Sequence, residues 1–327
     1  MSFKTYVAQR LLWTVFATFI IVSITFLLLA ASPNAQVSQF AFEAAQSPGT
    51  SAEEAREAAR QRLGTNQPLW ERYTEYMVNI FTLNWGYSQS GGGQLVTERI
   101  LNALPYTALY SVPTTILSVI IGVSIGLYSA TNQYSRFDYA ATFFAFFGYA
   151  IPNFWFGIIL LVIFGAWLGW VPIIFQPGVP WISFEMLKQL ILPVIVLVTA
   201  QTTGLMRYSR AEALEYVEAE FLKTAKAKGV SSYRVVTRHI FRPAAVPLMT
   251  ILISDLLGLF IASSLLVEVV FSIPGLGRLT FNAILQQDTP LVLSTTLVGV
   301  MIAVFGNLLQ DISYTVLDPR ISYDSRE

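Results

Sequence analysis

The sequence contains no cysteine and only one histidine, His239. The lack of cysteine excludes disulfides, thiolate metal sites and cysteine nucleophiles. A single histidine cannot form a zinc-type histidine cluster or a histidine relay within this chain. No P-loop pattern with its lysine and serine or threonine occurs, so the common phosphate-binding loop of an ATPase is absent. No fixed-period repeat is visible, which disfavours a secondary transporter built from inverted repeats.

Charged residues are also scarce. They make up 12% of the 327 residues, whereas 54% are hydrophobic and 14% are aromatic. So few charges cannot cover a long water-exposed surface, and most of the chain is therefore expected to face a lipid bilayer. The 20 basic residues balance the 20 acidic ones, so the total charge predicts no nucleic-acid partner.

Six segments are apolar over about the 20 residues that a helix needs to cross a hydrocarbon core of roughly 30 Å. Several contain proline or glycine, which membrane helices tolerate. The first follows Lys4 and Arg10 as a secretory signal would, but it is too long and has no small-residue cleavage pattern, so we expect a retained helix. The segments are residues 11–31, 105–130, 139–170, 190–206, 244–270 and 291–316.

The orientation follows from the short loops, because basic residues there stay on the cytoplasmic side. The loops predicted to lie outside, 171–189 and 268–290, carry only Lys188 and Arg278. The loop between the fourth and fifth segments should be cytoplasmic, with both termini on the same side of the cell membrane. Its eight basic residues are Arg207, Arg210, Lys223, Lys226, Lys228, Arg234, Arg238 and Arg242.

The chain divides into the N-terminus with its first helix (1–31), an extracytoplasmic loop (32–102) and a membrane domain (103–327) that includes the basic loop 207–242. Ser51 and Glu54 have the spacing of a capping box, Gly64 is placed to end that helix, and a second helix starts at Pro68. This outer layer is either solvated and packed on the membrane domain, or a docking surface for a partner protein. Residues 88–93 are rich in serine and glycine, which predicts a flexible turn.

The basic loop is predicted to fold into two short helices that meet at Gly229. In the first, Ala225 and Ala227 leave a low-relief face that another protein could approach closely, with lysines around it. The second starts at Ser231 or Ser232. It presents Val235, Val236 and Ile240 on one side, and Arg234, Arg238 and Arg242 on another.

These residues resemble the permeases of peptide-type ATP-binding-cassette importers, whose coupling motif reads approximately Y-V-R-T-A-R-A-K-G before a basic helix with an arginine–histidine pair. Here residues 221–229 read FLKTAKAKG, and Arg238 and His239 supply the pair. Similar stretches extend over nearly the whole chain. They are IPNFW (151–155), LGWVP (168–172), Pro247, Glu268 with FSIPGLGRL (271–279), and Asn307, Asp311 and Tyr314 with LDPRI (317–321).

The resemblance implies an all-α polytopic membrane protein with six transmembrane helices, of the type I importer permease kind, that is not itself an enzyme and holds no cofactor or metal. ATP and Mg would be bound by two separate ATPase subunits, whose cleft receives the cytoplasmic helices. The implied coupling residues are Glu220, Phe221, Lys223, Thr224, Ala225, Ala227, Lys228, Gly229, Arg238 and His239. We expect His239 to pack or hydrogen-bond there rather than to relay protons.

The other implied partners are a second homologous permease subunit, an extracytoplasmic solute-binding protein and the lipid bilayer. Dipeptides or oligopeptides are the implied substrates, although relatives carrying nickel complexes, glutathione or oligosaccharides leave those substrates open. The chain departs from the family at residues 32–35, which read SPNA instead of P-G-D-P, and at 64–68, which read GTNQP instead of G-L-D-x-P. Both departures bear on docking of the binding protein.

Asp255 lies midway along the fifth segment, where a charge costs on the order of 3 kcal/mol on insertion scales. It could line the translocation pathway, pair across a subunit interface, or simply face a water-filled cavity. Asn153 and Glu268 are further candidates for the pathway or the interface. A different class, an intramembrane aspartyl protease, would need two membrane carboxylates, and Asp255 and Asp311 are the pair that this chain offers. The glycine-flanked aspartates expected of such enzymes are absent, and a passive channel would have no use for the basic loop.

Overall fold

The computed structural model describes residues 3–31, 42, 51–62, 66–88, 90, 92–241, 243–244 and 264–317. All regular elements within these ranges are helical, which confirms the all-α class. In chain order they are α1 (Phe3–Ala31), α3 (Ala52–Arg62), α4 (Leu69–Phe81), α5 (Val96–Thr131), α6 (Arg136–Ala150), α7 (Asn153–Leu160), the π-helix η1 (Leu161–Trp167), α8 (Phe184–Val217), α9 (Glu220–Ala227), α10 (Ser232–Arg234), the π-helix η2 (Val235–Ile240), α12 (Ser264–Val270), α13 (Leu276–Leu285) and α14 (Thr289–Leu317).

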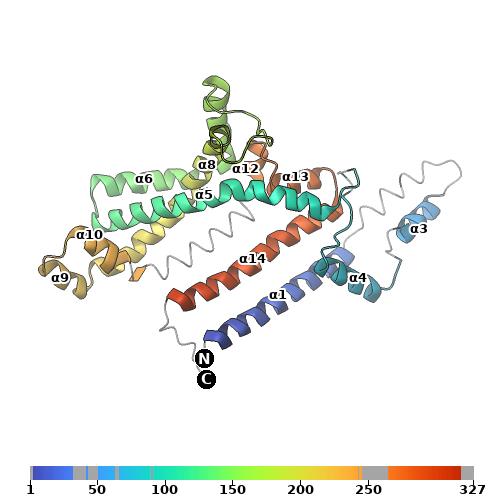
Figure 1. Ribbon diagram of the computed structural model, residues 1–327, viewed down its shortest axis with the longest axis horizontal. Coiled ribbons are helices and arrows are strands. Elements are labelled where there is room, and N and C mark those ends of the chain that lie inside the picture. The colour runs from blue at the N-terminus through green and yellow to red at the C-terminus, as the bar shows by residue number, and fades with distance from the viewer. Residues whose placement is uncertain are drawn as a thin grey trace.

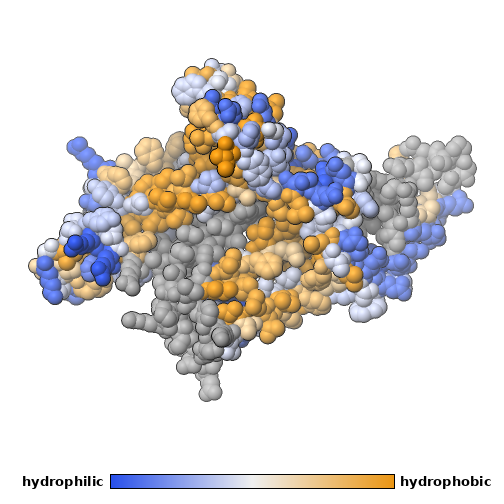
Figure 2. All heavy atoms as spheres, in the orientation of Figure 1, coloured by the Kyte–Doolittle hydropathy of each residue, from blue (hydrophilic) through white to orange (hydrophobic). Residues whose placement is uncertain are grey.

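Four of these helices, α1, α5, α8 and α14, are long and apolar enough to cross a membrane. They contain the first, second, fourth and sixth predicted segments. Figure 2 shows hydrophobic side chains gathered over α1, α5, α6 and α14, with hydrophilic ones over α9 and α10 and over α3 and α4. An apolar belt between two polar ends matches a bilayer with water on both sides.

The third predicted segment, 139–170, is not one continuous helix. Helices α6 and α7 are bent by 99° at a short break, so this pair is one broken span or a re-entrant element. Ile151 is extended (φ −95°, ψ 123°) and Pro152 precedes the first residue of α7. Proline disfavours the helical conformation of the residue before it and supplies no N–H to continue the ladder. The predicted IPNFW stretch is therefore a helix break.

The fifth predicted segment, 244–270, lies mostly outside the described residues. Its described C-terminal part is α12, which packs against α13 and α7. The described part of the chain therefore holds four candidate spans, or five when the bent pair is counted as one. The predicted count of six spans also includes the fifth segment, 244–270, most of which lies outside the described residues.

Helices α5 and α8 form the most extensive helix pair of the structure and lie side by side in Figure 1. Glycine makes this approach possible. A Cβ atom on Gly122 would lie 2.7 Å from Leu205 Cβ, and one on Gly126 would lie 2.6 Å from the Met206 carbonyl oxygen. Small residues at a helix interface let two backbones come close, which is the packing that membrane helices favour.

The two short helices predicted in the loop 32–102 form as α3 and α4. The Ser51 and Glu54 side chains cap α3 reciprocally, because Ser51 N donates to Glu54 Oε2 (2.9 Å) and Glu54 N donates to Ser51 Oγ (3.2 Å). The predicted end of this helix at Gly64 lies outside the described residues. Helix α4 packs on α1 through Tyr73, which hydrogen-bonds Ser23 (2.8 Å) and packs edge-on against Phe26.

Candidate functional site

The basic loop leaves α8 at Val217 and forms α9, whose C-terminal end has the hydrogen bonds of a Schellman motif. Gly229 N donates to the Lys226 carbonyl (3.0 Å), and Val230 N donates to the Ala225 carbonyl (3.2 Å). Gly229 has a φ of +74°, the left-handed region that glycine adopts without steric cost. The predicted meeting of two short helices at Gly229 is confirmed.

Helix α9 has an inner and an outer face. Leu222 is fully buried and Ala225 is only 8% exposed, so both face the rest of this chain. The prediction that Ala225 and Ala227 share an outer, low-relief face is therefore wrong for Ala225, which packs inward beside Leu222, and holds for the exposed Ala227. Lys223 and Glu220 form an exposed ion pair along the helix (2.7 Å). The exposed members of the predicted coupling set on this face are Glu220, Phe221, Lys223, Thr224, Ala227, Lys228 and Gly229.

The second short helix, α10 with η2, anchors this protrusion to the membrane helices. Val235 and Ile240 are buried in one hydrophobic cluster with Leu222 of α9 and Leu127 of α5. Arg238 is exposed and His239 is half-buried. The predicted separation into an apolar side and a basic side is confirmed for Val235, Ile240, Arg234 and Arg238, whereas Arg242 lies outside the described residues. A displacement of α9 would therefore reach α5 through packed side chains.

An ion pair that sequence analysis missed lies at the base of the same region. Arg210 of α8 contacts Asp138 of α6 through two hydrogen bonds, from Nε to Oδ1 (2.9 Å) and from Nη2 to Oδ2 (3.0 Å). Asp138 is 4% exposed and also accepts hydrogen bonds from Ser129 Oγ and Tyr134 N. Two-pronged geometry of this kind fixes orientation as well as distance. It ties the turn between α5 and α6 to the stem of the basic loop.

Glu268 organises the turn at the opposite end of α5. Its Oε1 accepts hydrogen bonds from Thr107 Oγ1 and Tyr110 OH (both 2.7 Å), and its Oε2 accepts one from Arg278 N (2.8 Å). The side chain is 0% exposed, and a Cβ on Gly275 would lie 2.4 Å from its carboxylate. The structure therefore does not support a place for Glu268 on a pathway or interface. The carboxylate holds the FSIPGLGRL turn instead.

A second buried carboxylate at this end holds the segment that contains Ser88 and Ser90. Asp288 is 0% exposed and accepts hydrogen bonds from Ser88 Oγ (2.5 Å), Ser90 N (2.9 Å) and Ser90 Oγ (2.6 Å). Arg99 Nη1 lies 3.7 Å from Asp288 and donates to Ser90 Oγ (3.0 Å). Burial raises the pKa of Asp288, but the bonds from Ser88 and Ser90 outweigh it and leave the pKa below its ordinary value. The flexible turn predicted at 88–93 is thus anchored at both serines.

The structure places the other predicted residues apart from one another. Asn153 lies beside the bend, where it lines a small cavity with Phe147 and Thr199. Asp255 lies outside the described residues, and its predicted role stays a prediction. Asp311 of α14 pairs with Arg10 of α1 (3.1 Å). This pairing ties two membrane helices together, which is not the environment of a catalytic carboxyl pair.

Within the described ranges, no group of three or more histidine, cysteine, aspartate or glutamate side chains is placed to hold a metal ion. The geometry instead gives an apolar helical belt (Figure 2), a charged protrusion beyond one end of α5 and a hydrogen-bonded polar turn near the other. These features define a multi-pass membrane protein with a charged helical protrusion beyond its apolar belt.

Comparison with known proteins narrows this class. Residues 122–323 match the family described as "Binding-protein-dependent transport system inner membrane component". The chain is 38% identical to the oligopeptide transport system permease protein AppB of Bacillus subtilis (strain 168), over 82% of this chain and 85% of that protein. It is 32% identical to the oligopeptide transport system permease protein OppB of Haemophilus influenzae, over 97% of this chain and 99% of that protein.

The chain therefore belongs to the family of binding-protein-dependent transport system inner membrane components. It is a non-catalytic, multi-pass permease of the inner membrane that works with a binding protein and an ATPase. This excludes the intramembrane protease interpretation of Asp255 and Asp311.

Proposed function

We propose that this chain imports dipeptides or oligopeptides as one of two homologous permease subunits, with two ATPase subunits that bind ATP and Mg on the cytoplasmic side. The observation that carries the proposal is the exposed rim of α9, from Phe221 to Gly229, held rigidly by the Gly229 helix end and the cluster around Leu222. A rigid protrusion of this kind suits insertion into a cleft of a moving partner. The peptide substrate is proposed from the relatives' names.

The proposed topology has six membrane-spanning helices, with α9, α10 and both termini in the cytoplasm and the outer loop on the other side. It is supported by the position of the basic residues, which gather at the α9 end of α5. A binding protein would release its peptide at the opposite end, next to the turn that Glu268 holds. Closure of the ATPase dimer would then shift α9 and alternate access to the pathway.

Reconstitution tests the proposal directly. The chain is placed in proteoliposomes with its partner permease, both ATPases and its binding protein, and uptake of radiolabelled trialanine is followed with ATP inside. Uptake that requires both ATP and the binding protein is the expected result. ATP-driven uptake of a nickel complex, glutathione or an oligosaccharide without uptake of any peptide would overturn the substrate class and leave the coupling role intact.

A further inference from the structure

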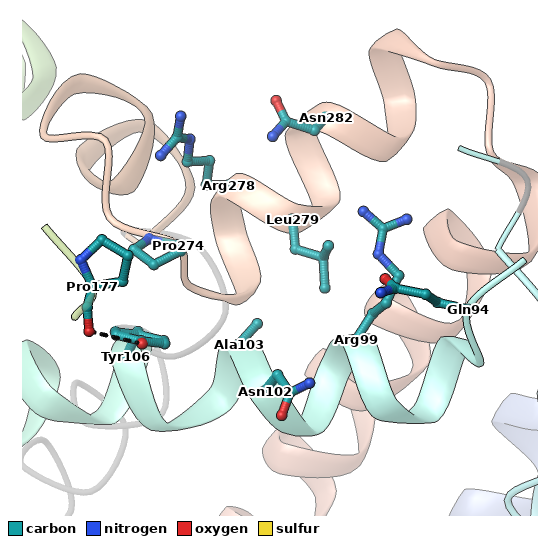
Figure 3. A pocket seen from close by; sticks show the side chains of 10 residues that line it. All are labelled: Gln94, Arg99, Asn102, Ala103, Tyr106, Pro177, Pro274, Arg278, Leu279 and Asn282. Atoms are coloured by element: carbon teal, nitrogen blue, oxygen red, sulfur yellow. Dashed lines mark hydrogen bonds between the residues drawn. The ribbon is translucent and has the colours of Figure 1, made fainter. Parts of the chain in front are cut away.

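A cavity of about 350 Å³, lined by both polar and apolar side chains, opens at the end of α5 that is remote from α9. Its walls come from the first turns of α5, from α13, and from two proline-containing loops. Figure 3 shows Arg278 on one side of the cavity and Arg99 on the other, with Leu279 and Ala103 between them. The cavity is separate from the coupling region, and it adjoins the Asp288 cluster because Arg99 contributes to both.

The lining of this cavity is rich in hydrogen-bond donors and carries positive charge. Two guanidinium groups and three carboxamides line it, and none of its lining residues is acidic. Those side chains belong to Arg99, Arg278, Gln94, Asn102 and Asn282. Arg99 already has an anionic partner in Asp288, which lies 3.7 Å away. The Arg278 guanidinium forms no ion pair with a described acidic side chain, so it leaves a positive charge in the cavity that a bound anion would neutralise.

Both arginines are positioned by bonds that leave part of each guanidinium group available. Arg278 Nη1 donates to the Ser272 carbonyl, and Arg99 Nη1 donates to Ser90. Within the described part of the chain, these bonds use one terminal nitrogen of each group. A guanidinium carries five N–H donors, so the remaining ones can reach a ligand. Pre-positioned donors lose little side-chain entropy on binding, which favours affinity.

The rest of the lining indicates the size and nature of the anion. Tyr106 forms an aromatic wall, packed edge-on against Phe175 with ring centroids 5.9 Å apart, and Pro177 and Pro274 extend this apolar wall. An apolar wall beside a cationic one fits a carboxylate attached to an organic group better than a fully hydrated inorganic ion. Guanidinium groups also match the planar carboxylate through paired hydrogen bonds.

We propose that this cavity binds a carboxylate group, with Arg278 and Asn282 as its main donors. The source of the carboxylate rests on the proposed function, which offers two. It is the terminal carboxylate of the arriving peptide, or an aspartate or glutamate side chain of the docked binding protein. In either case the cavity holds an incoming partner at the entrance, at the far end of α5 from the coupling helices.

Two variants test this in the complete complex in lipid nanodiscs. Arg278→Gln removes a charge, and the near-isosteric Asn282→Asp adds a negative one. The dissociation constant of trialanine from the complex is measured by saturation-transfer NMR without binding protein. The dissociation constant of the substrate-free binding protein from the complex is measured separately. Both variants should weaken one of these affinities by about tenfold or more, since a hydrogen bond to a charged group is worth that much. Arg278→Lys should restore part of it.

The controls distinguish the two sources of the carboxylate, and they distinguish failure of this proposal from failure of the proposed function. Lys188→Gln removes an exposed cation of α8 outside the cavity lining and should change neither affinity. If a variant binds trialanine more weakly but binds trialanine amide, which lacks the terminal carboxylate, as the parent does, the site binds the peptide terminus. If only the affinity for the binding protein falls, the site binds an acidic side chain of that protein. Unchanged affinities in both measurements, or competition by inorganic phosphate as strong as that by acetate, would overturn the proposal. Failure of the parent complex to import any peptide would count against the proposed function, and the docking measurement would still decide on the cavity.

Discussion

Gly229 ends α9 with a φ of +74°, and an added Cβ would meet no atom within 4 Å. The cost of a side chain at Gly229 is therefore one of backbone conformation, roughly 1 to 2 kcal/mol, together with bulk added to an exposed rim. We expect Gly229→Val to lower both transport and substrate-stimulated ATPase activity of the reconstituted complex severalfold. Membrane insertion should not change, because no membrane helix is touched.

Gly229→Asn is the matched variant, because asparagine tolerates the left-handed conformation. Activity close to that of the parent in Gly229→Asn would assign the effect of Gly229→Val to the helix end. Loss in both variants would assign it to bulk in the ATPase cleft. Normal transport and ATPase activity in Gly229→Val would remove this turn from the mechanism.

The ion pair between Asp138 and Arg210 should couple two helices energetically. Asp138→Asn leaves Arg210 without its anionic partner, and Arg210→Met leaves a buried carboxylate uncompensated. Each single substitution is expected to lower the free energy of unfolding by about 2 kcal/mol, less than for a fully buried pair because Arg210 is partly exposed. Thermal unfolding of the purified subunit measures this. The double variant should lose less unfolding free energy than the two single variants lose together. Strictly additive losses would show that the two residues are not coupled.

Because Asp288 accepts hydrogen bonds from Ser88 and Ser90, the stability of the segment 86–95 is expected to depend on pH. The pKa of Asp288 is lowered from the ordinary value of 3.8, so its stabilising contribution is complete above that pH and disappears as the pH falls through the lower, folded-state pKa. Amide hydrogen exchange across residues 86–95, measured from pH 5 down to pH 2.5, should show protection lost at the acid end beyond the intrinsic pH effect. Asp288→Asn should remove this step and leave the segment weakly protected throughout. An unchanged profile in the variant would contradict the anchoring role.

At the scale of elements, the approach of α5 to α8 depends on Gly126. A Cβ there would lie 2.0 Å from Ser209 Oγ and 2.6 Å from the Met206 carbonyl oxygen. We expect Gly126→Ala to lower the free energy of unfolding by about 1 to 3 kcal/mol, as overpacking does. Gly204→Ala is the control on the same helix pair, because its Cβ would meet nothing within 4 Å. Equal thermal stability of the two variants would contradict the close-packing argument.

Sequence reasoning predicted these elements unevenly. Long apolar runs reveal α1, α5, α8 and α14, because composition alone decides whether a helix suits lipid. The break at Pro152 was missed because membrane helices often tolerate proline. The burial of Ala225 was readable in principle, since it lies three residues after Leu222 and so shares its face. The pairing of Asp138 with Arg210 was not readable, because only the folded chain brings together positions 72 residues apart.

At the scale of the whole molecule, α5 fixes which surfaces lie on opposite sides of the membrane. Its 36 residues span about 54 Å at 1.5 Å per residue, more than the thickness of a bilayer with its headgroups. Glu98 lies in the first turn of α5 and is exposed, whereas Ser231 is exposed next to the cluster that covers the last turns of α5. These two positions should therefore face different compartments.

The absence of cysteine from the parent chain makes this testable without background labelling. An impermeant maleimide added to intact cells, with its access to the outer face of this membrane verified, should label Glu98→Cys and should label Ser231→Cys only after the membrane is permeabilised. The reason is the gathering of basic residues at the α9 end, which resists translocation. Labelling of Ser231→Cys in intact cells, with Glu98→Cys protected, would reverse the proposed orientation. Labelling of both would show that α5 does not span the membrane, and the coupling helices would then have no route to the outer turn.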